Sequence, residues 1–223
     1  MQEIIKPFRE SLFDKNLTDI GIDMLEVGID NLLQEGLAKN IPIVGSIVKV
    51  GQFVYNIYDR NLLKQTLVFI RHFNNNTIDS EKVKKYKESL ERDSSKAEKE
   101  LGRVLIILNK TIDLEKTNIL AKLYLAYVDE KIMWKDFCEF SEIIDRLFVN
   151  DIDILFDIHT KNKGGIYVER NADYIYQRLI SIGLLKNNIG IGALTHSHLQ
   201  GISEKPTHIE LTQLGHIFCR IVT

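Results

Sequence analysis

The most apolar segment of the chain covers residues 41–58, IPIVGSIVKVGQFVYNIY, and its pattern has the period of an α-helix. Pro42 suits the first position of a helix, where its missing N–H leaves no bond unmade. Apolar residues cover most of this helix, and a narrow strip holds its small and polar residues: Gly45, Lys49, Gln52, Asn56 and Arg60. A helix this apolar must be surrounded by other helices or by lipid. The pattern therefore predicts a buried central helix.

Two interpretations of this helix remain open. It is the core helix of a helical bundle, or it leaves the bundle and enters a membrane with its strip facing a pore, lipid headgroups or a protein partner. A permanent membrane span needs roughly 20 predominantly apolar residues. This run carries Lys49, Gln52 and Asn56 within it, which argues against a permanent span.

A second helix is predicted before this segment, from about Thr18 to Glu35, and the two form a helical hairpin with its loop near residues 37–41. Carboxylates recur along its one polar face: Asp19, Asp23, Glu26 and Asp30. This acidic stripe is either a solvated face or a docking surface for a basic partner or a divalent cation. Like charges at helical spacing cost only a few tenths of a kcal/mol per pair, so the stripe requires no function.

Helical periodicity continues along the chain. The helix from Pro42 is expected to extend past Tyr58 and to end at the polar run Asn74-Asn75-Asn76, with residues 59–61 as the place for a break within it. A further helix is predicted over residues 80–110, mostly solvated up to Lys99 and facing the core after Leu101. Tyrosines fall on the apolar faces here, which predicts that they lie in the core: Tyr86, Tyr124 and Tyr127.

Asp113 is placed to cap a helix that ends at Val128. A turn at residues 129–131 then leads into a helix from Trp134 to about Asn150. The run AYVDEKIMWKDF resembles the tight helical pairs of TerB-type bacterial stress domains. We expect a domain boundary before this pair, giving an N-terminal helical region over 1–112 and a C-terminal region over 113–223.

The end of the chain changes in character. A short helix over 151–160, a Gly164-Gly165 turn and a helix over 171–182 precede Gly183-Leu184-Leu185, and a glycine-rich polar stretch extends to Pro206. Leu211-Thr212 then leads into a last helix, with Thr212 as its N-cap and with Gly215 small enough to approach a sheet. Residues 135–223 resemble the winged-helix fold of MarR- and PadR-type bacterial regulators, which implies a small β-hairpin, the wing.

The resemblance implies DNA binding, with the 171–182 helix in the major groove. The residues that would contact bases or phosphates are Arg170, Tyr174, Gln177, Arg178, Ser181 and Lys186. Glu169 and Asp173 lie among them, and the wing adds few cations to neutralise phosphates. Winged helices also serve as protein–protein modules, so both functions remain open.

Composition narrows the functional classes. The 223 residues are 27% charged with a net charge of −2, which gives no overall field that attracts nucleic acid or anionic lipid. The charged N-terminus predicts a cytosolic location, peripheral to the inner membrane if residues 41–58 act there. Cys138 and Cys219 are expected to be reduced, buried thiols.

Motifs for catalysis and ligand binding are not evident. His196 and His198 would share one side of a strand, and with His208 they are best interpreted as loop histidines without a metal. No nucleophile elbow, phosphate-binding loop or carboxylate pair stands out. The sequence therefore predicts a non-enzymatic protein without cofactor, metal or small-molecule substrate.

The chain as a whole resembles bacterial proteins of stress or phage-defence loci. We expect a mainly α protein, in which a helical bundle with a buried central helix is followed by a winged-helix-like region. The leading functional hypothesis is an interaction or effector protein that binds a protein partner or itself, or acts on a membrane through residues 41–58. The alternative is a winged-helix transcriptional regulator that binds DNA.

Overall fold

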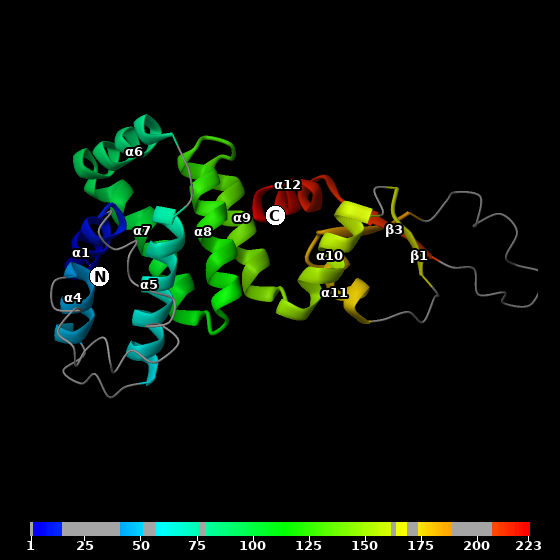
Figure 1. Ribbon diagram of the computed structural model, residues 1–223, viewed down its shortest axis with the longest axis horizontal. Helices are drawn as coiled ribbons and strands as arrows, with labels where there is room; N and C mark the ends of the chain where they lie inside the picture. The colour runs from blue at the N-terminus through cyan, green and yellow to red at the C-terminus, as the bar shows by residue number, and fades with distance from the viewer. Residues whose placement is uncertain are drawn as a thin grey trace, which may run out of the picture. The chain divides into compact units, whose positions relative to one another are not determined.

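A computed structural model describes residues 2–14, 41–50, 57–75, 79–161, 164–168, 174–188 and 207–223. Within these ranges the chain is mainly helical and has one small antiparallel sheet of three strands, as Figure 1 shows. It divides into two compact units, Met1–Ser141 and Glu142–Thr223.

The first unit is built only of helices in its described part. They are α1 (Gln2–Leu12), α4 (Pro42–Val50), α5 (Ile57–Asn75), α6 (Ser80–Arg92), α7 (Ser94–Lys110), α8 (Leu114–Val128) and the first part of α9 (Trp134–Arg146). α5 packs against α7 and α8, and α1 packs against α4 and α7. Large side chains from four of these helices fill the core and are almost fully buried: Phe8, Phe69, Tyr124 and Phe137.

Helix α4 begins at Pro42, as predicted, and buries part of its apolar face against α1. Ile43, Val44 and Ile47 are buried, and the Ile43 amide donates to Ser11 Oγ at 3.1 Å. Ile57 and Tyr58 were predicted to share this buried surface, but they are 74% and 70% exposed. They occupy the first turn of α5, so they do not extend the buried face of α4.

The first turns of α5 are attached to the loop between α7 and α8 by partly buried hydrogen bonds. Asn61 donates to the Thr111 carbonyl at 2.8 Å, and Gln65 donates to the Ile112 carbonyl at 2.7 Å. Gln65 also accepts from the Thr117 hydroxyl of α8. Because α8 packs on α5 in this way, it belongs to the first unit, whereas the sequence grouped it with the C-terminal region.

The second unit combines α10 (Val149–Lys161), β1 (Ile166–Val168), α11 (Tyr174–Ser181), β2 (Leu185–Asn188), β3 (Thr207–Leu211) and α12 (Gln213–Val222). The strand order is β1-β3-β2, with both pairs antiparallel. Ile166 pairs with Ile209, and Leu185 pairs with Leu211.

Two predictions in this unit need correction. The helix expected to reach Asn150 ends at Arg146, and the Asp151 amide bonds to the Phe148 carbonyl as α10 begins. The strand β1 was not predicted. It follows Gly165, whose φ of 88° is a backbone conformation that favours glycine, and it adds a third strand to the predicted hairpin.

Candidate interaction surface

Helix α11 is held in place by its buried side and by its connection to the sheet. Leu179 is fully buried, and the Leu184 amide bonds to the Leu179 carbonyl at 3.0 Å. Gly183, with φ of 80°, turns the chain from α11 towards β2. Four of the residues that the sequence assigned to DNA recognition lie on α11, away from Leu179: Tyr174, Gln177, Arg178 and Ser181.

Arg178 on this face is bound to a carboxylate of its own chain. Its Nε donates to Asp151 Oδ2 at 2.9 Å, and its Nη2 donates to Oδ1 of the same carboxylate. The Asp151 side chain is 1% exposed, whereas 30% of the Arg178 side chain is exposed. The hydrogen bonds to Asp151 raise the pKa of Arg178. The guanidinium therefore neutralises a buried charge in the first turn of α10.

Two aromatic rings flank the same guanidinium. The Arg178 Cζ lies 4.4 Å from the centre of the Phe148 ring and 4.6 Å from the centre of the Tyr174 ring, at cation–π distance. Phe148 is 56% exposed and Tyr174 is 70% exposed. We call Phe148, Tyr174 and Arg178 the aromatic–arginine surface.

Lys186 on β2 is also paired. Its Nζ lies 2.9 Å from Glu210 Oε1 on the neighbouring strand β3, and the hydrogen bond from Lys186 lowers the pKa of Glu210. Gln177 and Ser181 are exposed, and the Ser181 hydroxyl donates to the Arg178 carbonyl at 2.7 Å. Arg170 lies outside the described residues.

The net charge of the second unit also bears on how strongly this unit would attract the phosphates of DNA. Its sequence has nine acidic and eight basic residues between Glu142 and Thr223. DNA affinity depends largely on cations that neutralise phosphates. A unit with this balance, and with Arg178 and Lys186 bound to carboxylates, offers little such attraction.

The other predicted surfaces are described only in part. Gly45 lies in α4 and Arg60 lies half-buried in α5, whereas the Lys49 side chain, Gln52 and Asn56 fall outside the described residues. The acidic stripe also falls outside them: Asp19, Asp23, Glu26 and Asp30.

The histidines differ in what the structure describes. His208 Nε2 lies 2.9 Å from the Gly164 carbonyl oxygen, and its ring centre lies 4.8 Å from that of Tyr167. His196 and His198 are outside the described residues. Within the described ranges, no three potential metal ligands come together.

Sequence reasoning missed a buried polar cluster in the first unit. Glu100 of α7 is 5% exposed and accepts hydrogen bonds from the hydroxyls of Tyr86 and Tyr127, at 2.6 and 2.8 Å. The Tyr86 and Tyr124 hydroxyl oxygens are 2.6 Å apart. Burial raises the pKa of all three tyrosines. The prediction that these tyrosines lie in the core is confirmed for Tyr86 and Tyr124, whereas Tyr127 is half-buried. No local signal identifies Glu100 as the partner of Tyr86 and Tyr127.

Comparisons with known proteins give no relatives: no family model matches the chain, and no curated protein or solved structure is similar to it. Among the described helices, none combines the length and apolar character needed to cross a membrane.

Proposed function

We propose that the protein is a non-enzymatic interaction protein whose C-terminal unit is a winged-helix-like module that binds another protein. Support for the module comes from the β2–β3 hairpin after α11 and from the passage of Leu211-Thr212 into α12. The Thr212 hydroxyl accepts from the Gly215 amide at 2.9 Å, so Thr212 is the N-cap expected from the sequence. A role in bacterial stress or phage defence stays a prediction.

The proposal rests on the side chains of the α11 face, namely on which cations are already paired and which rings are exposed. Arg178 and Lys186, the described cations expected to contact DNA, are bound to Asp151 and Glu210. Two exposed aromatic rings, Phe148 and Tyr174, lie over Arg178. Aromatic residues and arginine are enriched at protein interfaces, whereas DNA binding draws its affinity from cations available to phosphates. The aromatic–arginine surface therefore favours a protein partner.

Site-specific photo-crosslinking in the cells that produce the protein tests this. A benzophenone amino acid in place of Tyr174 should give a discrete adduct with a protein, either another chain or a second copy. The adduct should disappear when Phe148→Ser is added. The same crosslinker in place of the exposed Lys85 on α6 is the control and should not give that adduct. Absence of any adduct at Tyr174, or an adduct with nucleic acid, would overturn the proposal.

The alternative function, a DNA-binding regulator, makes the opposite prediction. Fluorescence anisotropy with mixed-sequence DNA at low salt should then show salt-sensitive binding. Binding that Gln177→Ala and Lys186→Ala both abolish would establish the DNA-binding interpretation instead.

The membrane hypothesis for residues 41–58 also stays a prediction. Ile43, Val44 and Ile47 are buried in the bundle, so insertion requires α4 to leave α1 and break the bond between Ile43 and Ser11. Leakage of anionic liposomes that Val44→Glu abolishes would support the hypothesis.

A further inference from the structure

Helix α6 contributes few side chains to the core of the first unit. Only Tyr86 and Leu90 of its thirteen residues are buried, and most of the other eleven positions carry charged or polar side chains that face solvent. A helix of this length has little stability of its own in water. Its position on the bundle therefore depends on a small number of contacts.

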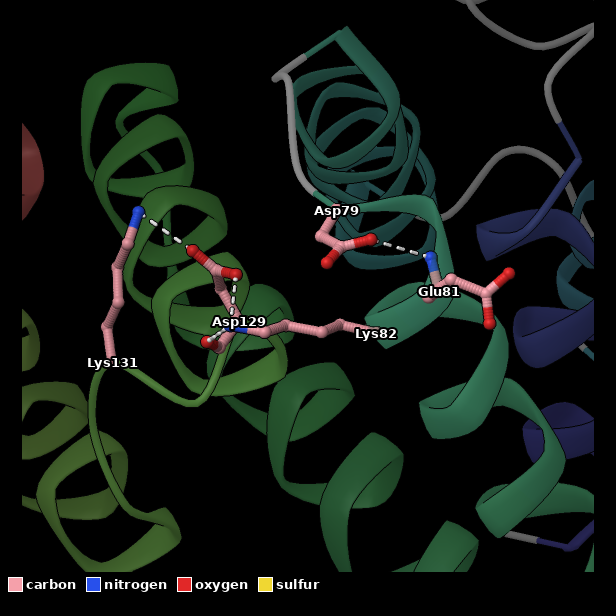
Figure 2. A network of polar contacts seen from close by, with 5 residues as sticks. All are labelled: Asp79, Glu81, Lys82, Asp129 and Lys131. Atoms are coloured by element: carbon pink, nitrogen blue, oxygen red, sulfur yellow. Dashed lines mark hydrogen bonds and ion pairs between the residues drawn. The ribbon is translucent and has the colours of Figure 1, made fainter.

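The N-terminal end of α6 is attached by a lysine. Lys82 Nζ donates to the carbonyl oxygen of Asp129 at 2.6 Å and to its Oδ1 at 2.9 Å. Figure 2 shows Lys82 reaching from α6 to the end of α8, where Lys131 approaches the same carboxylate at 2.8 Å. Asp79 caps the Glu81 amide within the α6 segment itself. The Lys82 side chain is 34% exposed, so water and salt compete for this contact.

The C-terminal end of α6 is held differently. Leu90 is fully buried, and Arg9 of α1 donates to its carbonyl at 3.0 Å. Asp93 is the single residue between α6 and α7, and its carboxylate caps α7 through the Lys96 amide at 2.9 Å. This end is therefore fixed beside the connection to α7, the middle of α6 is held by the hydroxyl bonds of Tyr86, and the N-terminal end is attached through Lys82.

The surface that α6 covers contains a buried carboxylate and tyrosine hydroxyls, which are polar groups in an otherwise apolar core. Tyr86 supplies one of the two tyrosine hydroxyls that bond to Glu100, and Tyr127 supplies the other. A buried carboxylate is costly unless its hydrogen bonds are made. The cluster is satisfied with α6 docked, and it gains water as an alternative partner when α6 lifts.

We propose that α6 is a lid that opens as one helix about Asp93, with the contact between Lys82 and Asp129 as its latch. Opening uncovers the Glu100 carboxylate and the hydroxyls of Tyr124 and Tyr127, which line the surface that Tyr86 covers. This inference concerns the first unit and does not depend on the function proposed for the second.

Amide hydrogen exchange of the full-length protein, followed by mass spectrometry, tests the lid. Amides of α6 should exchange faster than those of α8 under native conditions, since local opening exposes only the former. Lys82→Met keeps the aliphatic stem but removes the latch, and it should accelerate exchange in α6 at least about threefold. Exchange in α8 should stay unchanged and shows that the variant is folded.

The matched control is Lys84→Met, which removes the same charge from an exposed position on the same helix. It should leave exchange in α6 close to that of the parent protein. Equal protection of α6 and α8 would show that α6 opens only with the whole unit, and equal effects of the two substitutions would remove Lys82 as the latch. Either result overturns the proposal.

Discussion

At the scale of single residues, Arg178 illustrates how a residue distant in sequence determines what a side chain binds. Its position on the exposed side of a predicted recognition helix suggested contact with bases. Asp151, which precedes it by 27 positions, binds the guanidinium instead. Asp151 is almost fully buried, so it requires this cation whether or not the surface around it binds a partner.

Arg178→Met therefore should destabilise the C-terminal unit, because it leaves the buried Asp151 carboxylate without its cation. We expect its melting temperature, measured by calorimetry, to fall by about 5–10 °C. Adding Asp151→Leu should recover much of the loss, since the unpaired charge is then gone. Lys161→Met is the control, because it removes an exposed i,i+4 pair with Asp157 and should change the melting temperature little. Equal effects of Arg178→Met and Lys161→Met would contradict the buried-charge argument.

At the scale of elements, Gly215 sets how closely α12 approaches the start of β2. A Cβ at this position would overlap the Leu184 carbonyl oxygen and would lie 2.9 Å from Leu211 Cδ2. Those neighbours are anchored, because the Thr212 amide bonds to the Leu184 carbonyl at 3.0 Å and Leu211 pairs with Leu185. The helix must therefore move if the glycine is replaced.

Gly215→Ala should destabilise the protein, because the helix–sheet contact cannot open without loss of packing and hydrogen bonds. We expect about 1–3 kcal/mol from urea unfolding. Gly45→Ala is a matched substitution in α4, where a Cβ meets no atom within 4 Å. It should be neutral or stabilise by up to about 1 kcal/mol, as the helix propensities of alanine and glycine predict. If both substitutions stabilise the protein, the close approach of α12 does not constrain this position.

The sequence predicted elements well where a local signal marks their ends. Pro42 begins α4, Asn75 ends α5, and Thr212 caps α12. The sequence-based prediction failed where contacts between distant residues decide which side chains are buried. No local sequence signal shows that Tyr58 faces solvent, or that Glu100 accepts hydrogen bonds from two tyrosine hydroxyls of other helices. Periodicity identifies a face, but it does not identify what packs on that face.

The candidate surface was predicted only as a set of positions. The sequence placed Tyr174 and Arg178 on one exposed face of a helix, and the structure brings these two together. It omitted Phe148, because the expected helix passed through that position instead of ending before it. It also omitted Asp151 and Glu210, whose pairing with Arg178 and Lys186 changes the electrostatics of the face.

At the scale of the whole molecule, the boundary between the two units falls within α9, after Ser141. The sequence placed it near residue 112, between the helix expected over residues 80–110 and the helix capped by Asp113. The pairing of α8 with α5 moves the boundary along the chain by joining residues that are about 50 positions apart, as in the bond between Gln65 and Thr117. Each unit has its own buried side chains, exemplified by Phe69 in the first and Phe218 in the second.

The two cysteines should report the unfolding of the two units separately, because Cys138 lies in the first and Cys219 in the second. Cys219 is buried as predicted, but Cys138 is only half-buried, so its report is the rise in alkylation above the rate in the folded protein. Burial raises the pKa of the Cys219 thiol to about 12, so almost none of it is the reactive thiolate at pH 8. Its alkylation therefore requires the second unit to unfold. Pulses of iodoacetamide along a urea series, read by peptide mass spectrometry, should give one midpoint for each cysteine.

Gly215→Ala should shift the midpoint of Cys219 to lower urea and leave that of Cys138 in place, because the overlap it creates with Leu184 and Leu211 lies within the second unit. Phe69→Leu, which leaves a cavity beside Tyr124 in the first unit, should do the reverse. Together the two variants separate local packing from the cooperativity of the chain. A common shift of both cysteines with either variant would show that the protein unfolds as one cooperative body, and that the division after Ser141 has no thermodynamic counterpart.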